Sequence, residues 1–318
     1  MVLCGVLRLV KVGICGLMVA SCATTLLRGK PKTAQDTYEV ALEDLEDGLY
    51  PEAVAGFTEL KTKYPYSKFA ALADLRIADT HFERGKYVEA IDAYRAFLKY
   101  HPSHIEAAYA MFRIGESYYE QIPADWWFLP PSSEKDQAST RLAISAYRDL
   151  LARFPNLKKE EERTRLEKCQ EIAGVPESED RDKGDKANDE CHNLIRRQEL
   201  VDRGQARLDE CRRKLADHEM YVARFYFKRE RFKAAAVRVE QILSNYGGLG
   251  LDHEALWLAA RSRIELGETD KARQALERLS KEFPNTSEAE DATELLNQLG
   301  GTPADTGDSH KETEIDDG

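Results

Sequence analysis

Three cysteines in the second half of this 318-residue chain, Cys169, Cys191 and Cys211, carry its most evident potential for covalent chemistry. In an oxidising compartment two of them would pair and the third would stay free. The runs RLEKC, ending at Cys169, and RLDEC, ending at Cys211, are similar. A disulfide between Cys169 and Cys211 is therefore one candidate, and Cys191 is a competing partner that spacing alone does not exclude.

Other reactive residues do not occur at catalytic spacing. The sequence has no G-x-S-x-G, H-E-x-x-H, P-loop or C-x-x-C motif. The adjacent pair Cys191 and His192 lacks the spaced co-ligands of a metal site. We therefore expect neither an enzyme nor a cofactor or metal. A thiol redox protein is the competing class, and it would require a reactive thiolate in a positively charged pocket.

The first 21 residues have the features of a secretory signal peptide. Arg8 and Lys11 precede a short apolar stretch over residues 12–20, which is too short to span a bilayer. The residues Val-Ala-Ser directly before Cys22 resemble the lipobox of bacterial lipoproteins, in which the cysteine is acylated and becomes the mature N-terminus. We therefore expect lipidation of Cys22 and a membrane-surface anchor.

The residue after this cysteine indicates which membrane. Ala23 stands where an Asp would be expected in a lipoprotein that stays in the inner membrane. The resemblance therefore implies an outer-membrane lipoprotein that faces the periplasm, with residues 22–34 as its tether.

Composition excludes several classes of protein. The formal net charge is −11 and the pI is about 5.3, so binding of nucleic acid through a clustered basic face is not expected. A mean hydropathy of −0.56 with 32% charged residues excludes a polytopic membrane protein, and 42% hydrophobic residues argue against wholesale disorder. A soluble, helical body is predicted.

An internal repeat defines that body. The runs GLYPEA, ending at Ala53, and GKYVEA, ending at Ala90, lie 37 residues apart. Each is followed four residues later by an aromatic residue and twelve residues later by a proline. The same spacing recurs three more times, at Ala143, Tyr147 and Pro155, at Phe232, Ala235, Val239 and Gly247, and at Gly267, Ala272, Leu276 and Pro284.

Each copy is typical of a helical hairpin. Apolar residues follow the small Ala at +1, +4 and +7, which places them on one face of a helix. The glycine permits a turn, and the proline ends the second helix. The unit resembles the tetratricopeptide (TPR) family, which implies an all-α, right-handed α-solenoid of five hairpins with a concave face open to partners. The aromatic anchors Phe57, Tyr94 and Tyr147 are predicted to pack in the core.

Two insertions interrupt the period. The first, at about 121–140, contains Trp126–Leu129, which is predicted to fold back on the array or to contact a partner. The second, 158–214, holds 31 charged residues and no aromatic residue, and is predicted to form two helical arms around a disordered 177–188. The expected organisation is a signal peptide at 1–21, a tether at 22–34, TPR units 1–3 at 35–157, a charged insertion at 158–214, TPR units 4–5 at 215–299 and a disordered acidic tail at 300–318.

Residues 35–155 and 215–299 resemble the BamD family, outer-membrane lipoproteins of the β-barrel assembly machinery. The likeness rests on YPYSKFA from Tyr64, on DQA at 136–138 after the first insertion, and above all on LADHEMYVARFY at 215–226, continued by AAVRVE at 235–240. It implies a non-enzymatic scaffold that docks the POTRA domains of BamA, associates with other Bam lipoproteins and receives the C-terminal targeting strand of unfolded outer-membrane proteins.

The same resemblance implies two sets of site residues. Arg238 aligns with a family arginine linked to the BamA contact, and a salt bridge to a neighbouring unit is its structural alternative. The substrate-peptide groove would contain Tyr64, Tyr66, Phe69 and Arg76, with packing as the alternative role for some of them.

Two further adaptor functions compete with this one. A lipidated TPR pilotin of a secretin or pilus pore would share the anchor and the repeats, but not the run at 215–226. A periplasmic TPR adaptor of envelope constriction or peptidoglycan synthesis usually has an N-terminal coiled coil and no lipid.

Overall fold

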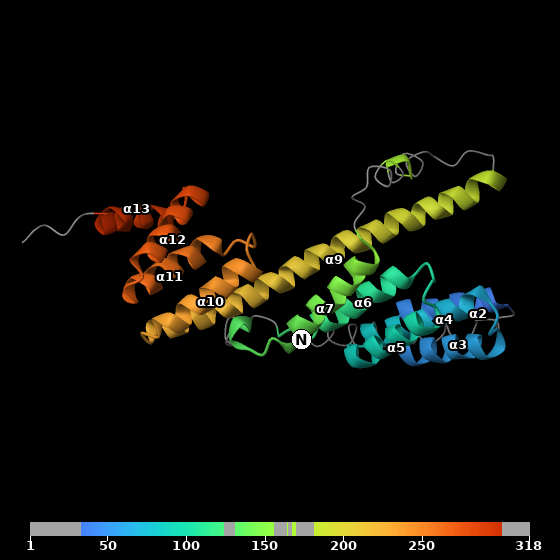
Figure 1. Cartoon of the computed structure of the whole chain (residues 1–318). Helices are drawn as coiled ribbons and strands as arrows, with labels where there is room; N and C mark the ends of the chain where they lie inside the picture. The colour runs from blue at the N-terminus through green and yellow to red at the C-terminus, as the bar shows by residue number, and fades with distance from the viewer. Residues whose placement is uncertain (1–32, 124–130, 156–163, 165–166, 170–180, 301–318) are drawn as a thin grey trace, which may run out of the picture. The chain divides into compact units, whose positions relative to one another are not determined.

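A computed structural model describes residues 33–123, 131–155, 164, 167–169 and 181–300 (Figure 1). The predicted signal peptide, Cys22, nearly all of the tether, the cluster Trp126–Leu129 and the acidic tail lie outside these residues. Every element of the described part is a helix, so the prediction of an all-α chain of helical hairpins is confirmed. The chain forms two compact units, Met1–Pro102 and Ser103–Gly318. Their boundary falls inside the predicted block 35–157, between the second and third hairpins.

The first unit contains two hairpins. Helix α2 (Ala34–Glu46) packs on α3 (Tyr50–Lys63), and α4 (Lys68–Glu83) packs on α5 (Tyr87–Tyr100). Thr33 caps α2 through a capping box with Asp36, and the Ser67 hydroxyl caps α4. Each cap gives a hydrogen-bond acceptor to a backbone N–H group that has no partner within the first turn of its helix.

The second unit contains three hairpins and a terminal helix. Helix α6 (Ala107–Tyr119) packs on α7 (Ala138–Arg153), α9 (Arg181–Lys228) on α10 (Phe232–Asn245), and α11 (Asp252–Glu265) on α12 (Thr269–Glu282). Helix α13 (Ser287–Gly300) packs against α12 and α11. A short 3-10 helix, η2 (Ser132–Glu134), precedes α7 and contacts α9.

The repeat anchors lie where the spacing predicts. Phe57, Tyr94 and Tyr147 have no exposed surface, which confirms their role in the core. The anchor alanines of all five hairpins are equally buried, because a side chain larger than a methyl group would separate the paired helices: Ala53, Ala90, Ala143, Ala235 and Ala272. The four anchor prolines follow helix ends at Lys63, Tyr100, Arg153 and Glu282.

The turns inside the hairpins require a left-handed backbone. Gly48, Gly85 and Gly267 have φ values of 75°, 69° and 72°, which glycine adopts without a steric cost. The fourth hairpin places Glu230 at the equivalent position with φ 60°. It is the one non-glycine residue of positive φ in the described part of the chain.

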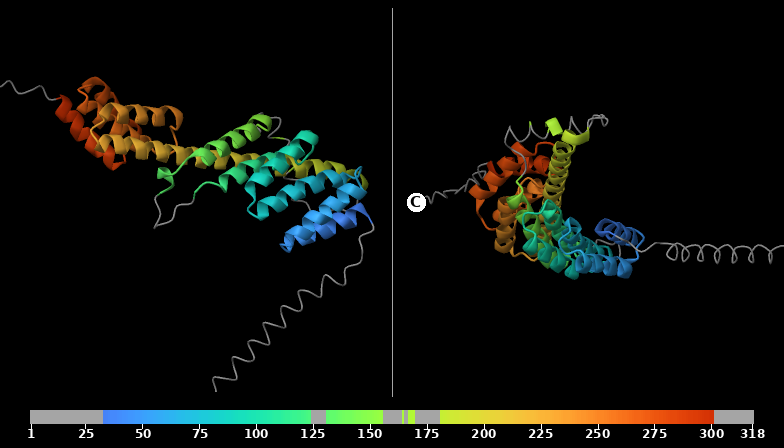
Figure 2. Two further views of the ribbon diagram at one scale, coloured as in Figure 1. Left: turned by 90° about the horizontal axis from the view of Figure 1, so that it is seen from below. Right: turned by 90° about the vertical axis from the view of Figure 1, so that its right-hand side faces the viewer.

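Helix α9 corrects the prediction for the charged insertion. Residues 177–188 were expected to be disordered. Residues 177–180 lie outside the described residues, whereas 181–188 form the first turns of α9, and this helix continues without a break to Lys228 (Figures 1 and 2). The predicted boundary between insertion and repeat, at 214 and 215, therefore lies within one helix. The middle of α9 packs on α6 and α7, and its last part packs on α10. Its sparse apolar residues lie on one face toward the third hairpin: Leu200, Leu208, Cys211 and Leu215.

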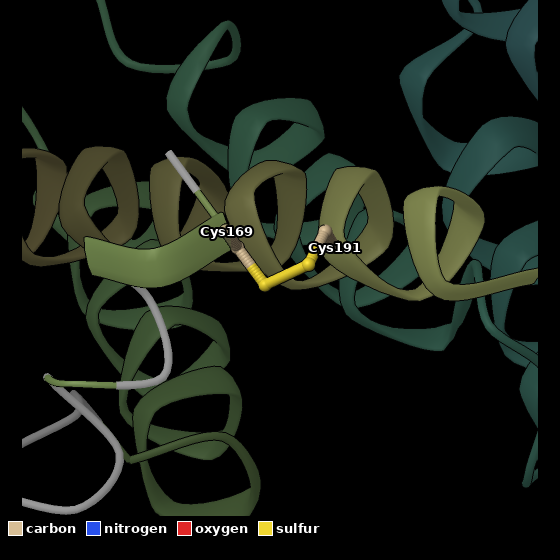
Figure 3. Close-up of a disulfide and its surroundings, with 2 residues drawn as sticks. All are labelled: Cys169 and Cys191. Atoms are coloured by element: carbon tan, nitrogen blue, oxygen red, sulfur yellow. A yellow bond between two sulfur atoms is a disulfide. The ribbon is translucent and has the colours of Figure 1, made fainter. Parts of the chain in front are cut away.

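The disulfide differs from the candidate pairing of Cys169 with Cys211. Cys169 is bonded to Cys191, with the two Cα atoms 5.0 Å apart, and Cys211 is free and buried (Figure 3). Cys191 and Cys211 are separated by twenty residues of one helix, a rise of about 30 Å. Cys169 can therefore reach only one of them. The bond ties residues 167–169 to the first part of α9.

Candidate partner-binding surface

Arg238 lies on α10 at the edge of the fourth hairpin. Its Nη1 donates a hydrogen bond to Oε2 of Glu219 on α9 at 2.7 Å, and its side chain is 38% exposed while that of Glu219 is 17% exposed. The pair links the two helices of one hairpin, not two neighbouring units. Because part of the guanidinium remains open to solvent, Arg238 can hold Glu219 and still meet a second acceptor.

A hollow of about 600 Å³ lies beside Arg238 at the turn between α9 and α10. Exposed apolar side chains, Val237 and Leu266, contribute to its lining together with Phe232 and Arg231. Glu230, the residue in the left-handed conformation, belongs to the same lining. Aromatic, apolar and arginine side chains at one partly open site are typical of the anchor region of a protein interface.

The run 215–226, which carried the family resemblance, builds the junction around this site. Ala216, Met220 and Ala223 are buried against α10 and α11. Several polar residues of the run have partners on other elements. His218 Nδ1 lies 2.6 Å from the carbonyl oxygen of Ser133 in η2, and Arg224 forms an ion pair with Glu254 of α11. The first insertion thus contacts α9 through His218, a role that the sequence alone did not reveal.

The predicted groove residues of the first unit have different roles. Tyr66 is fully exposed, and it is free to contact a ligand. Tyr64 and Phe69 are partly buried against the core of Ala41, Phe57 and Leu60. Packing therefore accounts for those two side chains, and the structure does not bring the four predicted residues together as one exposed cluster.

Arg76 belongs to an internal network of the first unit. Its Nη1 donates to Oδ2 of Asp79 at 2.5 Å, and its Nε donates to the hydroxyl oxygen of Tyr38 at 3.0 Å. The hydroxyl of Tyr94 donates to the other Asp79 oxygen at 2.5 Å. Burial alone would lower the pKa of Arg76, but the charge of Asp79 and the bond to Tyr38 raise it above its ordinary value. Arg76 therefore stays charged and neutralises a buried carboxylate.

A related network lies one repeat period later, in the second unit. Glu116 occupies the position 37 residues after Asp79, and it accepts the hydroxyl of Tyr147 at 2.5 Å. Its cation is Arg207 on α9, whose Nε donates to the same carboxylate at 3.1 Å. Burial and the bond to Glu116 raise the pKa of Tyr147, so this tyrosine remains a donor. The 37-residue offset was the signal that could have identified these buried carboxylates from sequence.

The free cysteine does not resemble a catalytic thiol. Cys211 is fully buried, and burial raises the pKa of its thiol to about 12. A nucleophilic cysteine requires the thiolate at neutral pH, so Cys211 acts as a small apolar residue under Tyr147 and Leu150 in the core of the third hairpin.

Neither a metal site nor a membrane span is found in the described residues. No group of three or more His, Cys, Asp or Glu side chains there is placed to hold a metal ion. No helix in the described ranges is both long enough and apolar enough to cross a membrane.

Comparison with known proteins gives the family. The family model of YfiO, described as outer membrane lipoprotein, matches residues 30–172 and 201–279. A relative from Caulobacter vibrioides, the outer membrane protein assembly factor BamD, is 26% identical over 267 residues, which cover 84% of this chain and 72% of that protein.

Solved structures of TPR proteins also match. A TPR protein of Thermus thermophilus is 13% identical with a TM-score of 0.29, and a TPR protein of Parabacteroides merdae is 14% identical with a TM-score of 0.30. Each match covers 84% of this chain and 98% of the other. Since the family model spans more than half of the residues, and includes the run that builds the α9–α10–α11 junction, this chain belongs to the YfiO family of outer membrane lipoproteins.

Proposed function

We propose that this lipoprotein is a non-enzymatic scaffold of the β-barrel assembly machinery, held on the outer membrane by acylated Cys22 and facing the periplasm. Its relative in Caulobacter vibrioides is named as an outer membrane protein assembly factor. The observation that carries the proposal is the family match over both halves of the repeat array. Helical hairpins with exposed edges and a thiol of raised pKa suit binding and not catalysis.

The BamA POTRA domains are the proposed partner of the fourth and fifth hairpins, with Arg238 as the anchor. Three features support this assignment. The guanidinium is held in place by Glu219, it is partly exposed, and it borders the hollow that Val237 and Leu266 line. An arginine that is already oriented loses less conformational freedom when it meets a carboxylate of a partner. Other Bam lipoproteins belong to the same proposed assembly.

The targeting strand of unfolded outer-membrane proteins is the proposed ligand of the first unit. The ligand expected there is an extended apolar peptide, which can dock its side chains against exposed aromatic rings. Tyr66 is the predicted groove residue with its ring fully exposed, so it is the proposed direct contact. The other three predicted residues would then stabilise the helices that present Tyr66. Tyr64 and Phe69 do so by packing on the core, and Arg76 does so through its bond to Asp79.

Capture of partners from detergent-solubilised outer membrane tests the scaffold function. The wild-type lipoprotein should recover BamA, and Arg238→Glu should recover less. Arg141→Glu is a matched control, because Arg141 is an exposed arginine of α7, outside the fourth and fifth hairpins. Recovery of a secretin without BamA would contradict the proposal and would favour the pilotin alternative.

A photo-crosslinking residue tests the peptide site. Placed at Tyr66, it should form adducts with unfolded outer-membrane protein. Placed at Val88, which is also exposed in the first unit, it should not. Equal labelling from the two positions would remove the predicted groove from the proposal.

A further inference from the structure

A second hollow, of about 380 Å³, lies where α9, α11 and α13 meet in the second unit. Its apolar lining comes from Met220 and Phe227 of α9 and from Trp257 and Leu258 of α11. Met220 and Leu258 are buried, and they form a floor that could accept one aliphatic side chain. Neither the family resemblance nor the proposed BamA contact assigns this site.

Some of the charged residues around this hollow form an ion pair, and others do not. Arg224 and Glu254 neutralise one another in an ion pair. The guanidinium of Arg261 stacks on the rings of Phe227 and Trp257, with its Cζ 5.0 Å and 5.9 Å from their centroids. These stacking contacts hold the Arg261 plane at the edge of the aromatic lining and leave its N–H groups for an acceptor.

The remaining balance of charge favours an anionic ligand. Lys228 and Arg261 have no carboxylate partner among the described residues, and Glu288 of α13 is the one acid of the lining outside an ion pair. Two cations against one carboxylate, above an apolar floor, fit a peptide in which an aliphatic side chain is flanked by acidic residues.

We propose that the occupant is the acidic tail of this same chain, residues 301–318. This segment contains six acidic residues and one lysine. Ile315 is its single large aliphatic residue, and it lies between Glu314 and Asp316. Ile315 enters the hollow formed by Met220, Phe227, Trp257 and Leu258, and the two neighbouring carboxylates reach Arg261 and Lys228.

The tail is long enough to reach this site. It begins after Gly300 at the end of α13, and Glu288 in the first turn of α13 lines the hollow. The 14 residues of α13 rise about 21 Å, at 1.5 Å per residue. The fifteen residues from Gly300 to Ile315 span up to about 50 Å when extended. The tail can therefore turn back along α13 without strain.

Competition between a tethered and a free tail tests the proposal. A fluorescein-labelled peptide of residues 301–318 is titrated with the full-length lipoprotein in detergent and with a variant that ends at Gly300, and its anisotropy is recorded. A short tether gives an effective concentration of about 1 mM, so a site with a Kd of about 100 μM is mostly occupied by its own tail. The peptide should therefore bind the full-length chain about ten-fold more weakly than the truncated one.

Two variants make the test specific. Arg261→Glu in the truncated chain should abolish peptide binding, and an Ile315→Ser peptide should bind far more weakly than the native peptide. Arg278→Glu serves as the control for a change of charge elsewhere, and circular dichroism confirms that each variant remains helical. These results do not depend on BamA capture, so the two proposals can fail separately.

Three outcomes would overturn the inference. The first is equal peptide affinity for the full-length and truncated chains. The second is the absence of binding to the folded, truncated chain. The third is competition that grows with protein concentration, which would assign the hollow to the tail of a second copy.

Discussion

Arg207 on α9 donates from Nε to Oε1 of Glu116 on α6, which lies 91 residues earlier in the chain, at 3.1 Å. The same Glu116 oxygen accepts the hydroxyl of Tyr147. The buried carboxylate of the third hairpin therefore obtains its cation from the charged insertion. Asp79, its counterpart in the second hairpin, obtains one from Arg76 within its own helix. The long helix α9 is thus attached to the third hairpin by charge as well as by its apolar stripe.

Arg207→Ala should destabilise the second unit, because it leaves the Glu116 carboxylate, which is 9% exposed, without its cation. Leaving a buried polar group without one of its partners lowers the free energy of unfolding by about 1–3 kcal/mol. Since the Arg207 side chain is 35% exposed, we expect the lower end of that range. Urea unfolding followed by circular dichroism measures the loss. Arg197→Ala, at an exposed position of the same helix, should leave the unfolding midpoint unchanged, and an equal loss in both variants would show that Glu116 does not depend on this ion pair.

Gly115→Ala tests the close approach of α6 to α7. A Cβ at Gly115 would lie 2.4 Å from Cε1 of Tyr147, and the ring cannot retreat without losing its bond to Glu116. We expect a net loss of about 1–3 kcal/mol from overpacking, although alanine favours a helix over glycine by about 1 kcal/mol. Thermal unfolding measures this net loss of stability.

Gly204→Ala is the matched comparison. Its Cβ would meet the terminal Cδ2 of Leu150 at 2.7 Å, and this flexible side chain can rotate away. The loss at Gly204 should therefore be smaller than the loss at Gly115. The reverse order would contradict the role assigned to the Tyr147 ring.

A charge swap separates docking from folding at Arg238. Arg238→Glu places two carboxylates together at the α9–α10 pair, and it should cost about 0.5–1 kcal/mol because the pair is partly exposed. The double variant Arg238→Glu with Glu219→Arg restores an ion pair, so stability should return to the wild-type value. Capture of BamA should stay low, because the positive charge has moved from α10 to α9. Full recovery of capture in the double variant would mean that Arg238 acts only through the hairpin.

Glu230→Gly should stabilise the fourth hairpin. Glu230 has a φ of 60° in a turn where three other hairpins have glycine, and a left-handed conformation costs a side-chain-bearing residue about 1–2 kcal/mol. We expect a gain of about 1 kcal/mol in the free energy of unfolding. Glu230 also lines the hollow beside Arg238. If its side chain contributes to BamA binding there, the Glu230→Gly variant should be more stable than the wild type but should capture less BamA.

Gly85→Glu is the reciprocal change. Nothing lies within 4 Å of a Cβ at Gly85, where φ is 69°, so its cost is conformational alone. It should lower stability by about 1–2 kcal/mol. Similar unfolding midpoints for the wild type and both variants would show that this turn carries no backbone strain.

Peptide mapping under non-reducing conditions should recover Cys169 linked to Cys191 and Cys211 as a thiol. Because the pKa of Cys211 is raised to about 12, its thiolate remains a minor species from pH 7 to pH 9. Iodoacetamide should therefore label Cys211 only after unfolding, while a small exposed thiol reacts faster as the pH rises through its own pKa. A peptide that links Cys169 to Cys211 would contradict the observed pairing.

The hairpin repeat was determined by the sequence itself. Anchor residues such as Ala53 and Phe57 make contacts between helices that are close in the chain, so their spacing is sufficient to predict their burial. The family resemblance likewise rested on a continuous run, 215–226, and the family match confirmed it.

Only the tertiary structure decided three features of this protein: the continuity of α9, the cysteine pairing and the partners of the charged residues. The insertion is so rich in charge that its composition indicated disorder at 177–188, whereas residues 181–188 belong to α9. A few apolar residues further along this helix, on one face, pack on α6 and α7. A helix of this length places Cys191 and Cys211 far apart, and it brings Arg207 to Glu116 across 91 residues. An ion pair or disulfide depends on which side chains meet in space, whereas periodicity in the sequence reports only which face of a helix is buried.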